Sequence, residues 1–373
     1  MKKYLQLSLS VLLFILTGTL LKAQSIGHWE LLKTSNKADA RSECGLAAVD
    51  GKLYLVGGDG PAKAVGIFDP ETLTWTTGAV APVPMHHFQA VSLDKKVYVL
   101  DAFDDGPYPN QIPAPNTYSY DTETGKWQKL TGLPDDRRRA GAGAAQHNGK
   151  LYLVCGIKHG HNSGTNNLFD EYDPKTDTWT ALPNAPHIRD HSMAVVIGDK
   201  LYAIGGRNTS LHDPDNFMSF FDKVVLDVDC YDFKTGKWST LDAKLPMGTG
   251  GGTAVNLRGK LFYVGGERAT ATTQNGPQKD VYYLNVSDPG AQWIAAAKLN
   301  KARNGVGGTV SNNKIYIAGG SGGGPGGPPP PNGQMPGGNL SNGQKPGSLP
   351  QGPPPGNGPP GSHGYIDVEV FSF

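Results

Sequence analysis

RAGAGAAQHNGKLYLVCG (residues 139–156) and YDPKTDTW (residues 172–179) make up the stretch of sequence that decides the fold. The first segment passes from small residues through a His-Asn-Gly turn into the apolar run LYLV. The second places Trp179 seven residues after Tyr172, across an Asp-Pro turn. Short apolar runs separated by turn residues predict antiparallel strands. We therefore expect this stretch to form one small β-sheet.

The same unit recurs along the chain. Each copy has a lysine-led apolar strand, and these strands begin at Lys52, Lys96, Lys150, Lys200, Lys260 and Lys314. A glycine follows the strand in every copy except the second, which has Leu100 and Asp101 there. In four copies an aromatic residue is followed by tryptophan after seven residues. A period of 44 to 60 residues indicates a repeat fold, which lets 373 residues fold without several separate cores.

The last copy has an aromatic residue, Phe371, but no tryptophan after it. The sixth tryptophan of the chain is Trp29, which precedes the first copy. A radial array of four-stranded sheets leaves no open edge only if its first and last segments share a sheet. We therefore predict an all-β fold, a six-bladed β-propeller with four antiparallel strands per blade. The N-terminal strand is predicted to complete the last blade and close the ring.

The glycine pair, the aromatic residue before Asp-Pro or Asp-Thr and the spaced tryptophan resemble the kelch repeat over residues 28–373. This resemblance implies a six-bladed kelch β-propeller. Gly266 and Glu267 with a nearby arginine also resemble a local feature of the exported sialic acid mutarotases (N-acetylneuraminate epimerases) of the kelch class. Copper-dependent galactose oxidases are a more distant resemblance, because they have seven blades and a tyrosine linked to cysteine.

Amino-acid composition predicts two segments that lie outside the blades, one at the N-terminus and one near the C-terminus. Residues 1–23 contain Lys2, Lys3, an apolar run and the small Ala23, which together predict a cleaved signal peptide. An uncleaved membrane anchor is the alternative. Residues 24–373 are then the propeller, and we expect it to be secreted or periplasmic, with no membrane contact after cleavage. The Gly/Pro-rich segment 321–361 is predicted to be a disordered loop inserted in blade six, or else a polyproline ligand for another protein.

The charge and cysteine content exclude two classes of protein. A formal net charge of +1 gives no overall attraction to nucleic acid. Cys44, Cys155 and Cys230 all fall within strand patterns, so they are expected to be buried thiols rather than a disulfide scaffold. We expect a monomer without a cofactor, whose partner is a glycan, an acidic small molecule or a protein.

The long loops after the second strands should all emerge on one face of the propeller, which we call the loop face, and function is expected there. The first strand of each blade also begins on this face. Aligned positions at its start are Arg41, Met85, Arg139, Arg189, Thr249 and Arg303. The positions two residues further on, which share their direction, are Glu43, His87, Gly141, His191, Gly251 and Gly305.

Two interpretations of these positions remain open. The arginines at 41, 139, 189 and 303 either tie adjacent blades through backbone carbonyls or converge on an anionic ligand, such as a carboxylate sugar or an acidic peptide. On the second interpretation the ligand-binding residues are these four arginines with Glu43, His87 and His191. Glu267 and Arg268 should project over the same channel mouth. They form either a general acid or base for a sugar or a solvated charge pair.

Histidines also gather on the predicted loop face. His86, His87, His159, His161 and His191, with Asp101 and Asp190 nearby, could together hold a divalent metal. No tight ligand motif is present, however, so we predict no metal site. A nucleophile elbow and a phosphate-binding glycine loop are also absent from the sequence. These features predict an exported binding or interaction module, with a sialic acid mutarotase as the alternative and a galactose oxidase-like copper enzyme as a minor one.

Overall fold

The computed structural model describes residues 26–272, 275–322 and 364–373. The predicted signal peptide and nearly all of the predicted Gly/Pro-rich loop lie outside these residues. Within the described ranges, no helix is both long enough and apolar enough to cross a membrane.

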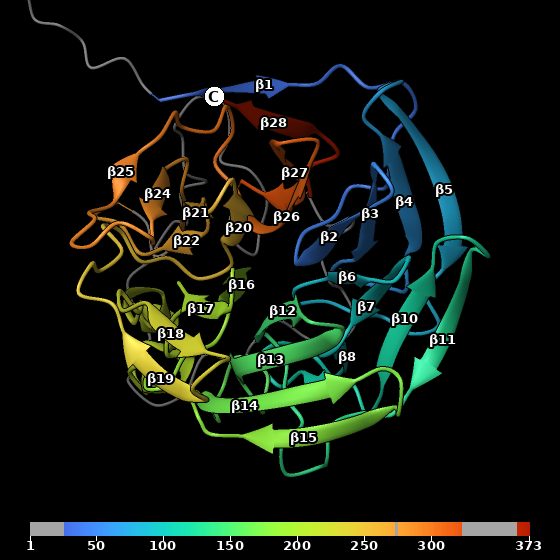
Figure 1. Ribbon diagram of the computed structural model, residues 1–373. Helices are drawn as coiled ribbons and strands as arrows, with labels where there is room; N and C mark the ends of the chain where they lie inside the picture. The colour runs from blue at the N-terminus through green and yellow to red at the C-terminus, as the bar shows by residue number, and fades with distance from the viewer. Residues whose placement is uncertain (1–25, 273–274, 323–363) are drawn as a thin grey trace, which may run out of the picture.

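Six four-stranded antiparallel sheets surround a central axis (Figure 1). Each sheet is one blade, and three of the six blades are built from four strands that are consecutive in the chain. Blade 1 consists of β2 (Cys44–Val49), β3 (Lys52–Gly57), β4 (Ala64–Asp69) and β5 (Thr74–Val80). Blade 2 consists of β6 (Val91–Leu93), β7 (Lys96–Val99), β10 (Thr117–Asp121) and β11 (Lys126–Leu130). Blade 3 consists of β12 (Gly143–His147), β13 (Lys150–Gly156), β14 (Asn166–Asp173) and β15 (Thr178–Leu182). Blade 4 consists of β16 (Met193–Ile197), β17 (Lys200–Ile204), β18 (Asp229–Asp232) and β19 (Lys237–Thr240). Blade 5 consists of β20 (Thr253–Leu257), β21 (Lys260–Val264), β24 (Val281–Asn285) and β25 (Ile294–Ala295). Blade 6 consists of β26 (Asn304–Ser311), β27 (Lys314–Ser321), β28 (Val368–Ser372) and β1 (His28–Leu31). The predicted six-bladed fold is confirmed.

The ring is closed by the N-terminal strand, as predicted. β1 pairs antiparallel with β28, and Trp29 lies opposite Phe371. The Trp29 indole Nε1 also donates a hydrogen bond of 3.0 Å to the carbonyl of Ala297 in the neighbouring blade 5 region. The first and last segments of the propeller therefore share one sheet, so no blade edge is left open at the junction.

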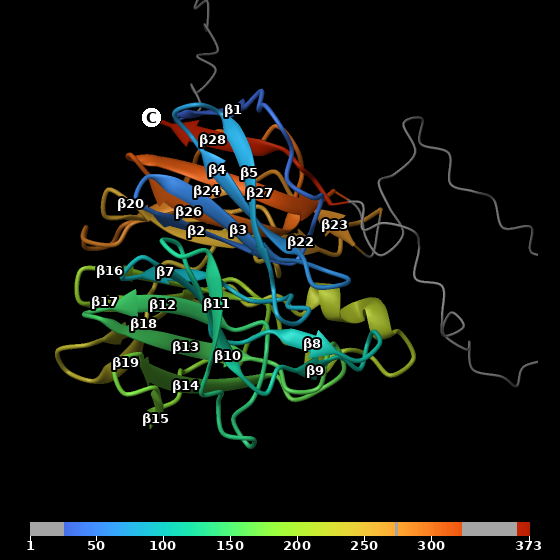
Figure 2. The ribbon, with the colours of Figure 1, turned by 90° about the vertical axis from the view of Figure 1, so that its right-hand side faces the viewer.

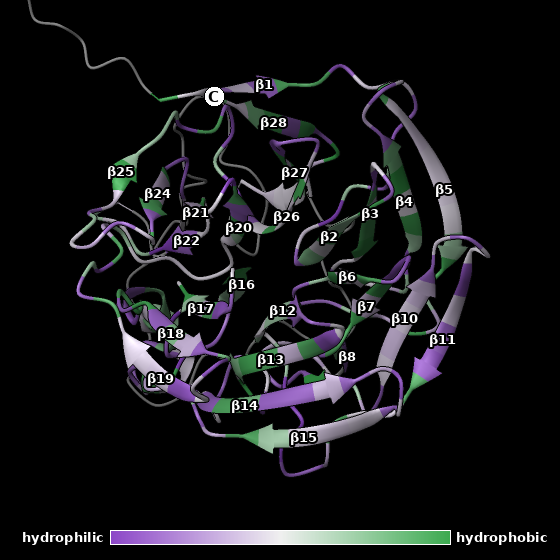
Figure 3. Cartoon of the chain, viewed as in Figure 1, coloured by the Kyte–Doolittle hydropathy of each residue, from purple (hydrophilic) through white to green (hydrophobic). Residues whose placement is uncertain are grey.

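In every blade except the fifth, the aromatic residue of the repeat packs on its tryptophan because the two lie opposite one another on paired strands; in blade 5, Tyr283 lies opposite Ile294 instead. Tyr172 pairs with Trp179 across β14 and β15, and their ring centroids are 5.0 Å apart. Apolar side chains of adjacent blades form the core between them; for example, Val56 of blade 1 packs with Val97 of blade 2. Figure 3 shows hydrophobic residues on inner strands such as β13 and hydrophilic residues on the outer strand β11.

The remaining strands and 3-10 helices all lie on the loop face. They are the hairpin of β8 (Phe103–Asp105) and β9 (Ile112–Pro113), the hairpin of β22 (Glu267–Arg268) and β23 (Gly276–Pro277), and two 3-10 helices at Thr209–Leu211 and Phe217–Asp222. In Figure 2 both hairpins lie toward one side of the disc of blades. The long loops thus emerge together, which is the arrangement expected from the sequence.

Candidate functional site

An inner ring of six residues surrounds the channel axis, one from each blade. Its members are the six positions at 43, 87, 141, 191, 251 and 305, and all have left-handed backbone with φ between 50° and 63°. Backbone hydrogen bonds link neighbouring members, such as Gly141 N to His87 O (2.7 Å) and Gly305 N to Gly251 O (2.8 Å). These hydrogen bonds fix the backbone of the inner ring, and with it the positions of its side chains beside the channel axis.

Three members of the inner ring are not glycine. Glu43, His87 and His191 adopt φ values of 53°, 59° and 50°, a conformation that costs a non-glycine residue about 1–3 kcal/mol and is often found at functional sites. Position 305 requires glycine, because a Cβ there would lie 2.4 Å from Glu43 Oε1. The strain at these three positions points to a role for their side chains.

The four predicted arginines do not converge on the channel. Each is at most 1% exposed and extends into its own blade. Arg41 donates to the carbonyls of Gly57 and Ala64, and Arg189 donates to Gly205 O. The structure therefore favours the backbone-tying interpretation, with one correction: the carbonyls belong to the second and third strands of the same blade rather than to the adjacent blade.

Three of these arginines also have a buried acidic partner at an equivalent position. The pairs, with N–O distances of 2.8, 2.8 and 3.0 Å, are Arg139–Asp170, Arg189–Asp229 and Arg303–Glu369. Each acid lies two residues before the third-strand aromatic. Blade 5, which lacks the arginine, has Thr249 and Val281 at these two positions. This correlation among the repeats is a sequence signal that could have identified the arginines as structural.

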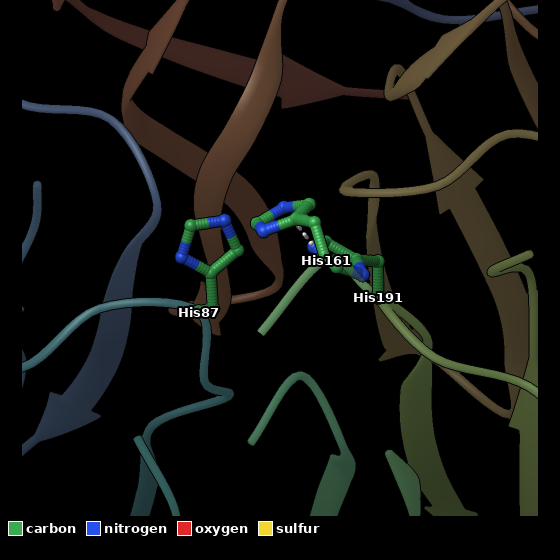
Figure 4. Close-up of side chains that lie close together, drawn as sticks. All are labelled: His87, His161 and His191. Atoms are coloured by element: carbon green, nitrogen blue, oxygen red, sulfur yellow. Dashed lines mark hydrogen bonds between the residues drawn. The ribbon is translucent and has the colours of Figure 1, made fainter. Parts of the chain in front are cut away.

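His87, His161 and His191 come together at the loop-face end of the channel (Figure 4). One ring nitrogen from each lies within 4.8 Å of the others. His161 Nε2 and His191 Nε2 are 3.1 Å apart. His87 and His191 come from the inner ring, whereas His161 comes from the loop after β13, so three blades contribute. The sequence suggested this combination, but the structure excludes Asp101 and His159 from it.

Each of these imidazoles has a polar neighbour. His191 Nδ1 contacts Asp190 Oδ1 at 2.6 Å, and His161 Nδ1 contacts Gln111 Oε1 at 3.2 Å. The Nδ1 atom of His87 contacts His86 Nδ1. Sequence reasoning missed Gln111, because the β8–β9 hairpin that carries it has no counterpart in the other repeats.

The surroundings affect the protonation of the acids and histidines in this region. Burial lowers the pKa of His87, His161 and His191. Neighbouring histidines and Arg207 lower the pKa of His87 and His161 further, and Arg207 does the same at His191, where Asp190 and Glu267 act in the opposite direction. Burial, with the carboxyls of Asp59 and Glu267, raises the pKa of Glu43 well above its usual value. The histidines are therefore neutral at physiological pH.

Glu267 lies at the rim of the same channel, as expected, but its partners differ from the prediction. Its carboxylate accepts a hydrogen bond from Arg207 at 2.9 Å and from Asn304 at 2.6 Å. Arg207 is stacked against Phe220, with 4.7 Å from its guanidinium carbon to the ring centroid. Arg268 instead contacts the adjacent carbonyl of Ala269. The buried charge pair is thus Glu267–Arg207 rather than Glu267–Arg268.

A larger groove opens on the loop face between blades 2 and 3. It encloses ≈ 420 Å³ and is lined by Asn110, Gln111, Ile112, Pro113, Asp135, Arg138, Lys158 and His159. Arg138 and Lys158 bring positive charge to its wall, and neither was a predicted site residue. Gln111 lines the groove and also contacts His161, so the groove and the histidines share one side chain.

Sequence comparison identifies the repeat. The KLHDC2/KLHL20/DRC7 Kelch-repeats domain family matches residues 108–320, and the Kelch motif family matches residues 40–79. The first match alone covers more than half of the 373 residues.

The chain belongs to the kelch-repeat family.

This kelch propeller is similar to longer proteins. Kelch-like protein terF of Aspergillus terreus is 27% identical over 79% of this chain, and Kelch-like protein 23 of Pongo abelii is 26% identical over 72% of it. The chain spans 64% and 43% of the length of these two relatives. A structure titled "Structure of YjhT" has a TM-score of 0.63 at 19% identity, covering 77% of this chain and 93% of that one. That likeness concerns the fold.

A kelch propeller is suited to binding and interaction. Its rigid blades support variable loops on one face, and such loops are where binding residues concentrate. In this kelch protein the loop face carries the histidine group, the Glu267–Arg207 pair and the groove.

Proposed function

We propose that this kelch propeller is an exported binding module and that its ligand is an acidic sugar or a glycan that carries one. The ligand occupies the groove between blades 2 and 3 on the loop face. One observation carries this proposal: the groove of ≈ 420 Å³ falls within the size range of small-molecule sites. The cavity beside the inner ring, at ≈ 20 Å³, is too small for a sugar.

The chemistry of the groove fits a carboxylate on a hydroxyl-rich ligand. The side chain of Arg138 is 28% exposed, so it can exchange its contact with Asp135 for a ligand carboxylate. Lys158 donates to the carbonyl of Asp136, which holds its ammonium at the same wall. Guanidinium and ammonium groups bind carboxylates through charge-assisted hydrogen bonds. The amides of Asn110 and Gln111 supply donors and acceptors for hydroxyl groups.

A second candidate function is sialic acid mutarotation. It is supported by the position of Glu267, because Arg207 and Asn304 hold its carboxylate in one orientation, and an oriented carboxylate can act as a general base for an anomeric hydroxyl. The neutral histidines nearby would accept or return the proton. On this proposal Glu267 acts on the anomeric centre of a sugar bound at the channel mouth on the loop face, a position separate from the groove between blades 2 and 3.

Proton NMR with N-acetylneuraminate and glucuronate tests both functions. Saturation transfer from the protein to either sugar is expected for the wild type. The double substitution Arg138→Glu with Lys158→Glu should weaken binding about tenfold or more, because each lost hydrogen bond to a charged group is worth ~1.5–3 kcal/mol.

The matched control is Lys126→Glu with Lys129→Glu on the outer strand β11, where both lysines are exposed. It should bind like the wild type. Binding that survives reversal of Arg138 and Lys158, or a wild type that binds neither sugar, would contradict the groove assignment. Interconversion of freshly dissolved α-N-acetylneuraminate that is no faster with the protein than without it would exclude the mutarotase while leaving the binding proposal intact.

A further inference from the structure

The three histidines at the channel end are too closely packed to be explained as ordinary core residues. His87, His161 and His191 are 8%, 5% and 5% exposed, and their ring centroids are 4.8 to 5.1 Å apart. Buried polar groups require partners, and three imidazoles this close cannot all carry a positive charge. Something must therefore satisfy their ring nitrogens together.

The same nitrogen of each ring already has a protein partner. Nδ1 contacts the Asp190 carboxylate in His191, the Gln111 amide oxygen in His161 and the imidazole of His86 in His87. An Nδ1 atom that donates to such an acceptor leaves Nε2 unprotonated in the neutral ring. Metal-ligating histidines nearly always have a carboxylate or carbonyl oxygen on their other nitrogen. His161 and His191 thus offer Nε2 as a lone-pair donor, and His87 does so when its Nδ1 donates to His86.

The spacing between two of these nitrogens also favours a shared cation. His161 Nε2 and His191 Nε2 are 3.1 Å apart. With both protons on Nδ1, these atoms present lone pairs to one another, which is repulsive unless a positive charge lies between them. Metal–nitrogen bonds of 2.0–2.1 Å in a tetrahedral site place ligand nitrogens about 3.3 Å apart. The observed separation is close to this value.

We propose that His87, His161 and His191 form a binding site for a divalent transition-metal ion, with Zn²⁺ as the representative ion. Neutral imidazoles suit Zn²⁺, Cu²⁺, Ni²⁺ and Fe²⁺, whereas Mg²⁺ and Ca²⁺ require oxygen ligands. Three protein ligands leave a further coordination position for water or for a ligand oxygen. The site is independent of the sugar groove, although Gln111 contacts both.

Space for a water molecule adjoins the ligands. A cavity of ≈ 20 Å³ is lined by His87, His191 and Glu43 together with the inner-ring glycines. A cavity of this size holds about one water molecule, provided that polar partners surround it. Glu43 supplies such a partner, because its Oε2 lies 3.5 Å from His87 Nε2. The carboxyl of Glu43 is thus placed to hydrogen-bond a metal-bound water.

A second group of possible ligands shares His87. Asp59, His86 and His87 also have ligand atoms within 4.8 Å of one another. The side chain of Asp59 is 39% exposed, and its Oδ2 accepts a hydrogen bond from Ser42. We favour the three-histidine group because all its members are buried and each has an orienting partner. The two groups differ in His161 and Asp59, so substitutions there separate them.

Metal binding is measured on the untagged mature protein after treatment with a chelator. Calorimetric titration of the wild type with Zn²⁺ should show one tight site per chain, and Co²⁺ should give the intense visible absorption of a nitrogen-ligated, non-octahedral ion. His161→Gln should weaken Zn²⁺ binding at least 100-fold. Gln111→Leu, which removes only an orienting partner, should weaken it about 10–100-fold.

Two control variants should bind Zn²⁺ within about threefold of the wild type: Asp59→Asn and His28→Gln, the latter an exposed histidine on β1. Thermal unfolding of each metal-free variant checks that it is folded. Loss of binding in Asp59→Asn with retention in His161→Gln would assign the ion to the other group and overturn the proposal. A wild type that shows no tight site, or only the weak Co²⁺ spectrum of an all-oxygen site, would overturn it even if a variant fails to fold.

Discussion

Asp101 stands where four of the other five blades have a glycine at the end of the second strand and blade 3 has Cys155, and its side chain joins two blades. Its Oδ2 accepts a hydrogen bond of 3.0 Å from the backbone N–H of Ala142 at the start of blade 3. The residue is 3% exposed, and burial raises its pKa from 3.8 to about 7 despite this bond and the charge of Arg139. The departure of this copy from the repeat thus introduces a titratable group into the blade interface.

The pKa of Asp101 predicts how stability changes with pH. Because the folded-state pKa lies above the ordinary value, the folded protein binds an extra proton between about pH 4 and pH 7, and the free energy of unfolding falls as pH rises through this range. Asp101→Asn removes this contribution and keeps an acceptor for Ala142. From about pH 5 to pH 8, the variant should lose ~1–3 kcal/mol less stability than the wild type, since one pKa unit corresponds to about 1.4 kcal/mol.

Urea unfolding of both proteins at several pH values measures this difference. The comparison uses the change in the free energy of unfolding with pH. Any destabilisation by the asparagine amide that does not depend on pH therefore cancels. Parallel slopes for the two proteins would show that Asp101 does not titrate in this range.

At the scale of the strand, the recurring arginine organises each blade in which it occurs. Arg139 donates to the carbonyl of Leu153 at 3.1 Å and forms an ion pair with Asp170 at 2.8 Å, so one side chain connects the second and third strands. Both charges are buried, with exposures of 1%. Breaking such a pair costs more than replacing it with apolar residues, because a single remaining charge has lost its compensation.

The blade 5 residues at these positions provide a test of this pairing. Asp170→Val alone should destabilise the protein by ~3–5 kcal/mol, because it leaves Arg139 buried without its carboxylate. Adding Arg139→Thr, as in blade 5, should make the double variant ~1–3 kcal/mol more stable than the sum of the two single changes predicts. The measurement is a double-mutant cycle by chemical denaturation. Arg139→Thr combined with Asp229→Val in blade 4 is the control and should be additive.

At the scale of the whole molecule, one short strand converts an open array of blades into a ring. β1 contributes four residues, and Trp29 is its only buried member, 8% exposed. Its indole ring packs on Phe371 with centroids 5.3 Å apart and hydrogen-bonds to Ala297. The tryptophan therefore connects the N-terminal strand to both the last strand and the preceding blade.

Trp29→Ala should accordingly destabilise the propeller by ~3–5 kcal/mol, the usual cost of truncating a large buried aromatic residue. Trp127→Ala is the matched comparison, because Trp127 holds the same repeat position in blade 2, pairing with Tyr120, but does not close the ring. Its cost should be smaller, since the Trp127 indole N–H has no hydrogen-bond partner to lose. Thermal and denaturant unfolding compare the two, and equal destabilisation would argue against a special role for the closure.

The sequence by itself determined the number of blades, their strand order and the closure by Trp29. These features depend on the spacing of turns and aromatic residues along the chain, which the backbone converts directly into hairpins with a fixed register. The inner-ring positions were also predictable, because equivalent residues of a repeat occupy equivalent places. Glu43, His87 and His191 were found in this way.

Only the tertiary structure decided where the side chains of the loop face meet. His161 and Gln111 lie in loops that have no counterpart in the other repeats, so alignment of the copies could not place them beside His191. The direction of the arginines was likewise open, because a guanidinium at the channel end can turn toward the axis or into its blade. Buried carbonyls and the acids at 170, 229 and 369 draw three of them into the blades, since buried charges require close partners.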